Sequence, residues 1–274
     1  MKKDTMQLLI PIIILAMCVS YLLIQPGGLS LDVDFKGGTQ IVIESSQAFD
    51  TTSMENILKQ YEVTIRVAKG LSSYSTMIDF DASIDQTEVV NTLKENGFVF
   101  EKYSVQSVSP ILSASFFSQA IMVLIVSFVF MSLVILYIFK SPVISAYIAI
   151  SPAISIIETL AITQMLGIKL SMAGFAALIM IVGYSVDGDV IIATRALKRT
   201  DITMNERFKA SFKTSLTMQI TTIAALTALL IFSVSGVITT IAIYLLIGLI
   251  LDLQNTWLLN ANLLRRYIDK KGVK

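Results

Sequence analysis

Residues 118–139 read SQAIMVLIVSFVFMSLVILYIF, and this stretch decides the fold class of the chain. It contains no charged side chain, and Lys140 follows it directly. An apolar run of about 18 residues or more is long enough to cross a bilayer as a helix. The stretch is therefore a predicted membrane-spanning helix.

Five other regions are apolar over a similar length. The six predicted spans are 7–24, 118–139, 143–165, 171–193, 214–234 and 237–260. The composition agrees, because 54% of the residues are hydrophobic and only 15% are charged, whereas soluble domains carry about 25% charged residues. We therefore expect a membrane all-α bundle of six transmembrane helices.

The first span could be a retained anchor or a cleaved signal peptide, since Lys2 and Lys3 precede its apolar run. The residues from Tyr21 to Pro26 offer no small-residue cleavage site. A retained helix is the favoured interpretation.

The basic residues indicate how the chain is oriented. With the N-terminus in the cytoplasm, the basic loop 195–213 and the basic tail 265–274 both lie on the cytoplasmic side. Of the short outer loops, the one between the third and fourth spans carries only Lys169. Both termini are thus expected to be cytoplasmic. The loop 195–213 is amphipathic, with Phe208 and Phe212 on one side, and is expected to lie along the inner headgroups.

Residues 25–115 are polar and predict a compact extracytoplasmic domain of α+β type. Apolar and polar residues alternate as in strands in 39–44, 63–67 and 76–80, and a last strand is expected over 98–105. Capping-box patterns at Thr52 and Ser83 predict two short helices, and Gly70 and Ser72-Ser73 predict a hairpin turn. The order βαββαβ is the ferredoxin-like pattern. The chain is expected to divide into a first helix (1–24), an external domain (25–115), a five-helix bundle (116–264) and a basic tail (265–274).

Four carboxyl groups fall inside predicted spans, where ionisable groups are costly and often functional. A helical rise of about 1.5 Å per residue places Asp187, Asp252 and Gln219 in one layer on the inner half of the membrane, with Thr222 one turn further out. By the same estimate Glu158 lies about 13 Å further out and does not join this layer. Asp189 is expected near the inner interface, within reach of Arg195 or Lys198 in water.

A carboxyl group in a low-dielectric medium can bind and release a proton near neutral pH. An elementary charge that crosses the membrane field gains about 2.3 kcal/mol per 100 mV, enough to drive a conformational change. A proton relay is therefore the favoured role of Asp187. For Asp189, Asp252 and Glu158 the alternative, that they only join helices through hydrogen bonds, is as strong or stronger. Lys213 is either a snorkelling anchor, which its spacing favours, or a partner of the relay.

The same composition excludes several classes of function. The chain has no histidine and one cysteine, Cys18, so we expect no metal site. It has no phosphate-binding loop, and Gly37-Gly38 is a turn rather than a nucleotide fingerprint. We expect no cofactor, no catalytic residue and no enzyme activity. A net charge of +1 does not suggest a nucleic-acid partner.

Two motifs resemble those of a known family. Asp34-Phe35-Lys36-Gly37-Gly38-Thr39 resembles the Asp-Phe-x-Gly-Gly-Thr signature of the SecF family, membrane subunits of the protein-export machinery. Gly183-Tyr184-Ser185-Val186 resembles that family's Gly-Tyr-Ser-Ile, and the layout of six spans with one large external loop is similar too. The resemblance implies a subunit of a SecD–SecF complex that assists Sec-dependent translocation, coupled to the proton gradient.

The chain also departs from the bacterial pattern. Asp187-Gly188-Asp189 stands where Asn-Asp-Thr is usual, and the stretch from Val186 is similar to the Val-Asp-Ala-Asn of SecD. The resemblance therefore carries the relay role to Asp187, with Asp189 second. Lys213 stands where an arginine is usual, and Asp252 has no bacterial counterpart. The pattern is similar to the archaeal branch of the family.

The resemblance implies four partners: a SecD-like subunit, the Sec channel, unfolded secretory proteins and the lipid membrane. Two other functions stay open. The chain could be half of a proton-driven small-molecule or lipid exporter of the resistance-nodulation-division superfamily, or a static scaffold of the channel. An external domain of about 90 residues is small for a lipid tunnel, which favours protein export.

Overall fold

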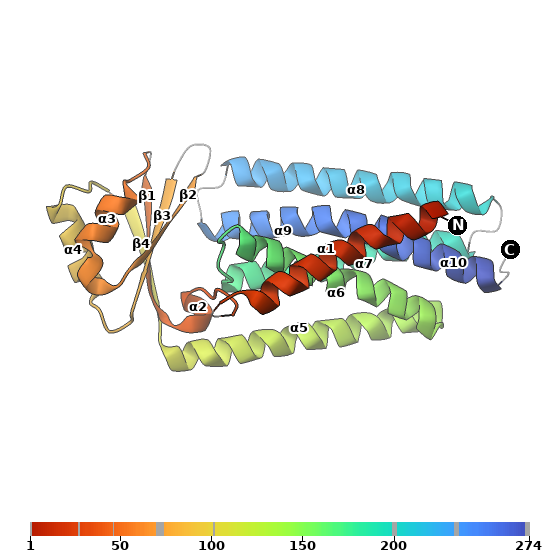
Figure 1. Cartoon of the computed structure of the whole chain (residues 1–274), viewed down its shortest axis with the longest axis horizontal. Helices are drawn as coiled ribbons and strands as arrows, with labels where there is room; N and C mark the ends of the chain where they lie inside the picture. Colours follow the sequence, from red (N-terminus) through yellow and green to blue (C-terminus); the bar gives the residue numbers. More distant parts are fainter. Residues whose placement is uncertain are drawn as a thin grey trace.

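A computed structural model describes residues 2–26, 28–45, 47–69, 74–100, 102–198, 202–232 and 236–271. It contains a bundle of long helices with a small sheet domain at one end (Figure 1). The start of the first helix and the end of the last lie at the opposite end of the bundle. The predicted turn at Gly70 and Ser72-Ser73 is outside the described residues, as are the last three residues of the basic tail.

Five helices of the described part are long and apolar enough to cross a membrane, by length and composition. The first helix, α1 (Lys2–Ile24), has a shorter apolar stretch, Leu8–Ile24. The five long helices are α5 (Pro110–Phe139), α6 (Pro142–Met165), α7 (Met172–Lys198), α8 (Met204–Phe232) and α9 (Gly236–Gln254), and α9 continues through the π-helix η2 (Asn255–Asn260) into α10 (Ala261–Lys271).

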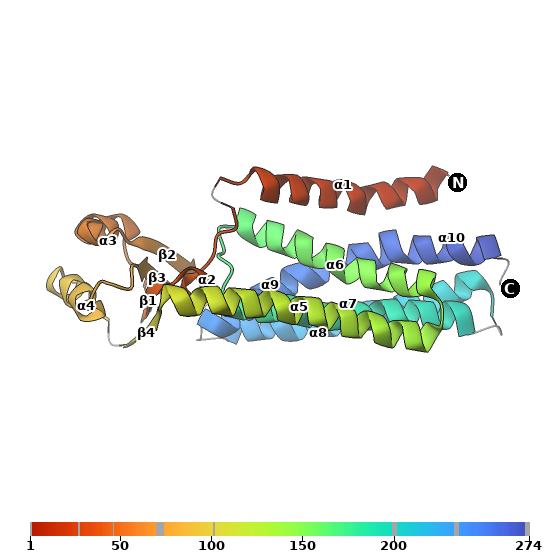
Figure 2. The ribbon, with the colours of Figure 1, turned by 90° about the horizontal axis from the view of Figure 1, so that it is seen from below.

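Helix α7 is central in the bundle and packs against α6, α8 and α9. A Cβ at Gly174 would lie 2.9 Å from the Tyr244 ring of α9, and a Cβ at Gly248 of α9 would collide with Ile181. Small residues thus bring α7 and α9 into close contact, as is common between membrane helices. Helix α1 stands to one side of the bundle and contacts α6 and η2 (Figure 2).

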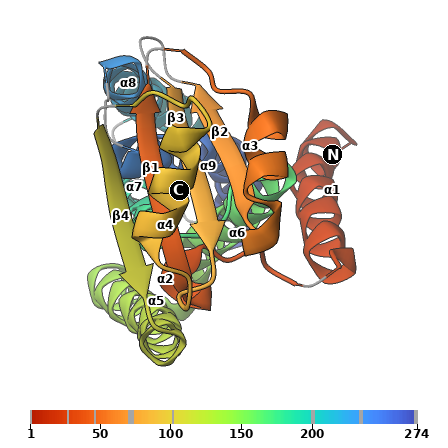
Figure 3. The ribbon, with the colours of Figure 1, turned by 90° about the vertical axis from the view of Figure 1, so that its left-hand side faces the viewer.

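The external domain has a four-stranded antiparallel sheet in the order β2-β3-β1-β4 (Figure 3). Its strands are β1 (Gly38–Ser45), β2 (Thr64–Lys69), β3 (Tyr74–Phe80) and β4 (Lys102–Val108). Helices α3 (Thr51–Ile57) and α4 (Gln86–Glu95) cover the sheet face that points away from the bundle. Alternate residues such as Ile41, Ile43 and Ile78 bury their side chains completely beneath these helices. The alternation predicted from the sequence therefore marks the core face.

The helix starts of this domain differ from the prediction. Asp50 and Asp85 are the N-caps of α3 and α4, and their carboxylates accept hydrogen bonds from the amides of Thr52 and Thr87. The predicted capping boxes at Thr52 and Ser83 are therefore wrong. An aspartate oxygen reaches the free amides of a first turn as well as a hydroxyl does.

The prediction that residues 195–213 form a loop is wrong, whereas their place along the inner headgroups stays a prediction. Helix α7 continues to Lys198 and α8 begins at Met204, so most of this segment is helical. Arg207 is only 6% exposed, and its guanidinium donates to the carbonyl oxygens of Ala196 at 3.1 Å and Ile202 at 2.9 Å. It thus satisfies a free carbonyl at the end of α7, which favours positive charge.

Candidate functional site

Buried polar side chains from several helices meet around Asp252, which is fully buried on α9. Ser155 of α6 donates to Asp252 Oδ1 at 3.2 Å, and the Gln219 amide of α8 donates to Asp252 Oδ2 at 3.2 Å. Ser185 of α7 faces the same carboxyl group without a well-formed hydrogen bond. The structure therefore brings Asp252 and Gln219 together, as predicted.

Glu158 belongs to this cluster, so the prediction that it lies outside is wrong. The Asn255 amide donates to Glu158 Oε2 at 2.8 Å and to Ser155 Oγ at 3.1 Å. Side chains of a helix tilt toward its N-terminus, which is the end of α6 further from the external domain, and this tilt carries Glu158 toward Asn255. The helices are also staggered along the bundle axis, so that Ser155 of α6 lies level with Asp252 of α9. A depth counted from span centres could detect neither effect.

Asp189 is deeply buried as well. It is 1% exposed, and Ser151, Thr256 and Asn260 face its carboxyl group. The prediction that it meets Arg195 in water is wrong, because the Arg195 guanidinium donates to the Ala210 carbonyl at 2.6 Å. The side chain of Lys198, the other predicted neighbour, lies outside the described residues.

Asp187 occupies the opposite face of α7. Successive residues of an α-helix are about 100° apart, so two positions separate Asp187 from Asp189 by roughly 200°. Asp187 is exposed and lines a small groove with Gln219 and Thr222 of α8. Gln219 thus contacts both the groove and the buried cluster. Lys213 is exposed on α8, nine residues after the helix begins.

The second family motif divides between these two faces. Gly183 and Tyr184 are exposed on the side of Asp187, whereas Ser185 is fully buried beside Asp252. The short motif therefore turns from the outer surface of the bundle to its core within one helical turn.

No basic side chain of the described residues forms an ion pair with Glu158, Asp189 or Asp252, since all three ion pairs found there involve Arg66 or Lys169. An ionised carboxylate without a partner is very costly in a low-dielectric interior. We call the six residues Ser155, Glu158, Asp189, Gln219, Asp252 and Asn255 the core cluster.

Sequence reasoning missed the amides and hydroxyls around these carboxyl groups. Asn255, Thr256 and Asn260 all lie on η2 and are all buried. Polar residues inside an apolar span were the available signal, but the π-helix was not predicted. Such wide turns occur frequently at functional sites.

The first family motif lies at the other end of α7. Asp34, on the short helix α2 (Val33–Lys36), accepts a hydrogen bond from the Met172 amide at 2.8 Å. Met172 is the first residue of α7, where free amides and the helix dipole favour a negative charge. Gln106 of β4 donates to the other oxygen of Asp34. One carboxylate therefore joins the sheet to α7.

Phe35 of the same motif packs edge-on against Phe117 of α5 and Phe175 of α7, with ring centroids 5.5 and 6.1 Å away. Gly37 has a φ of +86°, and a Cβ there would lie 2.8 Å from Pro110 Cα at the start of α5. Only glycine suits both the conformation and the contact. The motif thus fixes the sheet to two membrane helices.

The last two motif residues belong to the sheet. Gly38 has a φ of +131°, and a Cβ there would lie 2.9 Å from the Phe80 carbonyl oxygen of β3. The Thr39 and Ser107 hydroxyls are 2.9 Å apart across β1 and β4. These residues let β1 start directly after α2.

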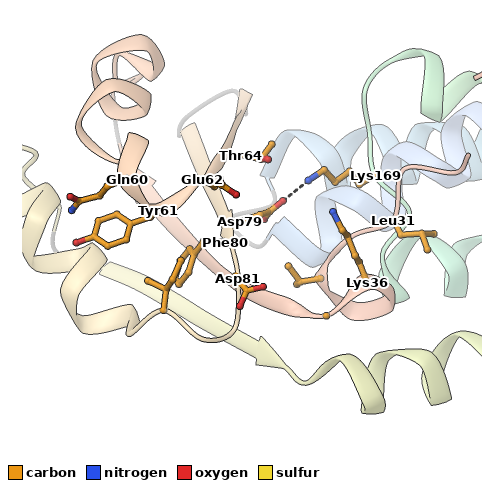
Figure 4. A pocket seen from close by; sticks show the side chains of 13 residues that line it. Leu31, Lys36, Gln60, Tyr61, Glu62, Thr64, Asp79, Phe80, Asp81 and Lys169 are labelled. Carbon is orange, nitrogen blue, oxygen red and sulfur yellow. Dashed lines mark hydrogen bonds and ion pairs between the residues drawn. The ribbon is translucent and has the colours of Figure 1, made fainter. Parts of the chain in front are cut away.

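An ionic cluster strengthens the same junction, and Figure 4 shows its pair of Asp79 and Lys169. Asp79 Oδ2 lies 2.7 Å from the Arg66 guanidinium and 2.7 Å from Lys169 Nζ, and Arg66 also contacts Asp32 at 3.1 Å. Burial opposes the ionisation of Asp79, but Arg66 and Lys169 outweigh it and hold its pKa below the ordinary value. Burial raises the pKa of Asp32, which Arg66 only partly offsets. A cleft of about 440 Å³ opens beside Asp79 and Lys169.

Lys169 lies in the connection between α6 and α7, so this cluster again reaches α7. Backbone hydrogen bonds join the same two segments. The Asp32 amide donates to the Leu170 carbonyl at 2.9 Å, and the Leu170 amide donates to the Ser30 carbonyl at 2.8 Å. We call the contacts of Asp32, Asp34, Arg66, Asp79, Lys169 and Leu170 the junction latch. The latch holds the sheet domain on the first turn of α7.

Comparisons with known proteins agree with this architecture. The family model described as "Protein export membrane protein SecD/SecF, C-terminal" matches residues 88–270. The chain is 34% identical to the protein-export membrane protein SecF of Methanocaldococcus jannaschii over 281 residues, covering 100% of this chain and 99% of that protein. It is 33% identical to SecF of Pyrococcus furiosus, covering 88% of this chain and 82% of that protein.

Among solved structures, SecDF of Thermus thermophilus matches with a TM-score of 0.79 at 16% identity. The match covers 97% of this chain and 38% of that longer chain, and it shows a shared fold. The long apolar helices and the full-length relatives together make this a multi-pass membrane protein. The chain belongs to the SecF family of protein-export membrane proteins.

Proposed function

We propose that the chain is a subunit of a SecD–SecF complex in which ion movement through the membrane moves the external domain and so assists Sec-dependent translocation across the cytoplasmic membrane. One observation carries the proposal. Helix α7 carries Asp189 of the core cluster, and it begins in the junction latch, about 25 Å away by its rise per residue. A change in the core cluster that shifts or turns α7 acts directly on the external domain.

The exposed face of α7 supports a partner subunit. Asp187 is exposed there beside Gly183 and Tyr184. A carboxyl group on a lipid-facing surface is costly, so a second subunit or a water-filled interface has to cover it. The solved relative of Thermus thermophilus is a longer chain named SecDF, and a SecD-like subunit is the partner that we propose for this face.

The contacts of the core cluster support a proton relay. The path leads from Asp187 in the groove to Gln219, then to Asp252, and through Ser155 and Asn255 to Glu158. Asp189 lies beside it and interacts with Asp252. In this proposal Thr222 lines the entrance from the groove, and Lys213 lies on the same helix closer to the cytoplasm.

The proposal includes a topology. Helix α1 has 23 residues, about 35 Å at the usual rise, which suffices for a hydrocarbon core of about 30 Å. It is therefore the sixth span, and both termini are cytoplasmic. The strand and helix order of the external domain supports a ferredoxin-like fold for residues 25–115 outside the membrane. There the domain would act on unfolded secretory proteins leaving the Sec channel, without catalysis and without a cofactor.

The test is export into vesicles that carry an imposed pH gradient. Asp187→Asn keeps the size of the side chain but cannot titrate, so we expect assembly with the SecD-like subunit and loss of gradient-dependent export. Lys209→Met, an exposed charge near the cytoplasmic end of α8, is the matched control and should export normally. If Asp187→Asn assembles and exports at the wild-type rate, the relay through Asp187 is wrong and a static scaffold becomes the better account.

A further inference from the structure

The two edges of the external sheet differ in how they are protected. Strands β2 and β4 are the edge strands. An edge strand presents unpaired backbone amides and carbonyls, and proteins usually protect such an edge with charged side chains, a proline, a bulge or a covering helix. Strand β2 carries Arg66 at its centre and Lys69 at its end, and helix α3 packs against it. The β2 edge is therefore protected in the usual way.

In the part of the chain that the structure describes, strand β4 lacks these protections along most of its length. It pairs with β1 in an unbroken antiparallel register, from Gly38 opposite Val108 to Glu44 opposite Lys102, so it contains no bulge. It has no proline, and its only charged residue, Lys102, stands at the end away from α5. Figure 3 shows β4 as the outermost strand on its side of the sheet. Its outer backbone groups are therefore available to another chain.

Exposed apolar side chains follow the same edge. Tyr103 of β4 is 45% exposed, and Val99, three residues before the strand, is 83% exposed. Within the described residues of the external domain, Val67 of β2 is the only other large apolar side chain that is exposed, at 36%. An extended chain beside β4 would cover Tyr103 with its own side chains while its backbone completed the hydrogen bonds of the edge.

The size of this edge decides what kind of partner fits it. A strand of seven residues extends for about 24 Å, whereas a stable interface between folded proteins buries about 1,200 Å² or more. One strand edge supplies only a small part of that area, so it cannot by itself hold a folded subunit or a second copy of this chain. It suits an unfolded chain that is held briefly. Such a chain has free amides and carbonyls, and backbone recognition accepts any side-chain sequence.

We propose that the outer edge of β4 binds an extended segment of the secretory protein by adding it to the sheet as a further strand. The inference rests on the proposed function, because it names the part of the external domain that acts on the translocating chain. Strand β4 is joined to α7, since the Gln106 amide donates to Asp34, whose carboxylate also accepts from the Met172 amide. A chain held on β4 therefore moves with the junction latch.

Peptides with blocked amides test backbone recognition directly. The probe is a fluorescent seven-residue peptide of alternating threonine and valine, titrated against the purified full-length protein in lipid nanodiscs by fluorescence anisotropy. In an added strand, alternate amides point to β4 and away from it. N-methylation of one alternate set should therefore weaken binding by about tenfold or more, and N-methylation of the other set should leave it unchanged. A peptide of alternating serine and leucine should bind within about threefold of the first.

Amide hydrogen exchange locates the bound peptide. Binding should slow exchange in residues 102–108 and leave residues 64–69 unchanged. Tyr103→Ser removes the apolar contact and should weaken binding about threefold. Val67→Ser is the matched control, because Val67 lies in the same row of the sheet as Tyr103 on the opposite edge, and it should bind like the wild type.

The inference is overturned if both methylated peptides bind alike, if neither unmodified peptide binds, or if the protected amides lie on β2. The complex with the SecD-like subunit gives a further test. Protection of the β4 amides before any peptide is added, together with loss of peptide binding, would assign the edge to that subunit and overturn the inference. None of these measurements needs a pH gradient. Gradient-independent export by a protein that binds the peptide on β4 would instead count against the proposed function alone.

Discussion

The molecule contains two buried polar clusters that solve the same electrostatic problem in different ways. In the junction latch, Asp32 and Asp79 are neutralised by Arg66 and Lys169 at 2.7 to 3.1 Å. In the core cluster, Glu158, Asp189 and Asp252 have amide, hydroxyl and carboxyl neighbours but no basic one among the side chains that the structure describes. A fixed positive charge makes the first cluster a permanent joint. The second cluster has no fixed positive charge among the described residues, and in our proposal a mobile proton or cation takes that place.

The largest effect is expected from a change that turns the core cluster into a latch. Gln219→Lys places a fixed positive charge beside Asp252, where the amide now donates at 3.2 Å. The protein should still assemble, but export should fall to the level seen without a gradient, because no mobile ion is then needed for neutrality. Gln219→Met removes the same link of the path without adding a charge, so its export should fall less than that of the lysine variant. Undiminished gradient-driven export in the lysine variant would contradict the comparison.

The opposite change breaks the latch. Arg66→Met leaves Asp79 its ion pair with Lys169 and leaves both acids the Gln40 amide. Removing one partner of a buried ion pair lowers the free energy of unfolding by about 3 kcal/mol. Since the Arg66 side chain is 22% exposed, water screens the pair, and we expect the free energy of unfolding to fall by about 2 kcal/mol. Thermal unfolding of the purified protein in detergent measures this loss. Arg265→Met, at an exposed site bonded to Asn205, is the control; equal melting points for both variants would show that the latch contributes nothing.

Asp34 tests how the latch holds α7. Asp34→Ala removes the cap of the Met172 amide and should lower the free energy of unfolding by about 1 kcal/mol. Asp34→Asn keeps an acceptor oxygen and should lower it by about half as much, chiefly because the interaction with the helix dipole is lost. Amide hydrogen exchange of the first turn of α7 should rise in the same order. Slow, unchanged exchange in the alanine variant would remove Asp34 from the latch.

The smallest expected effect is a difference in how Asp32 and Asp79, the two acids paired with Arg66, contribute to stability at different pH. The depressed pKa of Asp79 means that its contribution to stability is present above about pH 4 and is lost as pH falls through the folded value. The raised pKa of Asp32 has the opposite sign, so that contribution is lost as pH rises. At pH 7, Asp79→Asn should therefore lower the melting point, and Asp32→Asn should change it little or raise it. A larger loss for Asp32→Asn would reverse the assignment.

Hydrophobic runs and strand alternation predicted most of the fold. The apolar stretches predicted α5 to α9 to within a few residues at most ends, because long apolar runs have few other stable structures in a membrane. The start of α5 was placed too late, since Pro110 and Ser113 are too polar for an apolar window although they suit a helix start. The π-helix was not predicted, because its residues read as an ordinary helix.

The candidate site was predicted in part. Asp252 and Gln219 meet as the depth estimate indicated, but rise per residue gives no rotation, stagger or side-chain tilt. That is why Glu158 was excluded and why Asp187 and Asp189 were not separated onto opposite faces. The contact between Asp34 and α7 joins residues 138 positions apart, and no local pattern reveals such a pair.

The central claim is that α7 transmits the state of the core cluster to the junction latch. The most direct measurement is amide hydrogen exchange of residues 166–176 in the complex with the SecD-like subunit, reconstituted in nanodiscs, for wild type and Asp252→Asn. Asp269→Asn, an exposed acid on α10, is the control. The account predicts that exchange at the Leu170 and Met172 amides changes severalfold in Asp252→Asn and stays constant in Asp269→Asn. Identical exchange in all three proteins would contradict it.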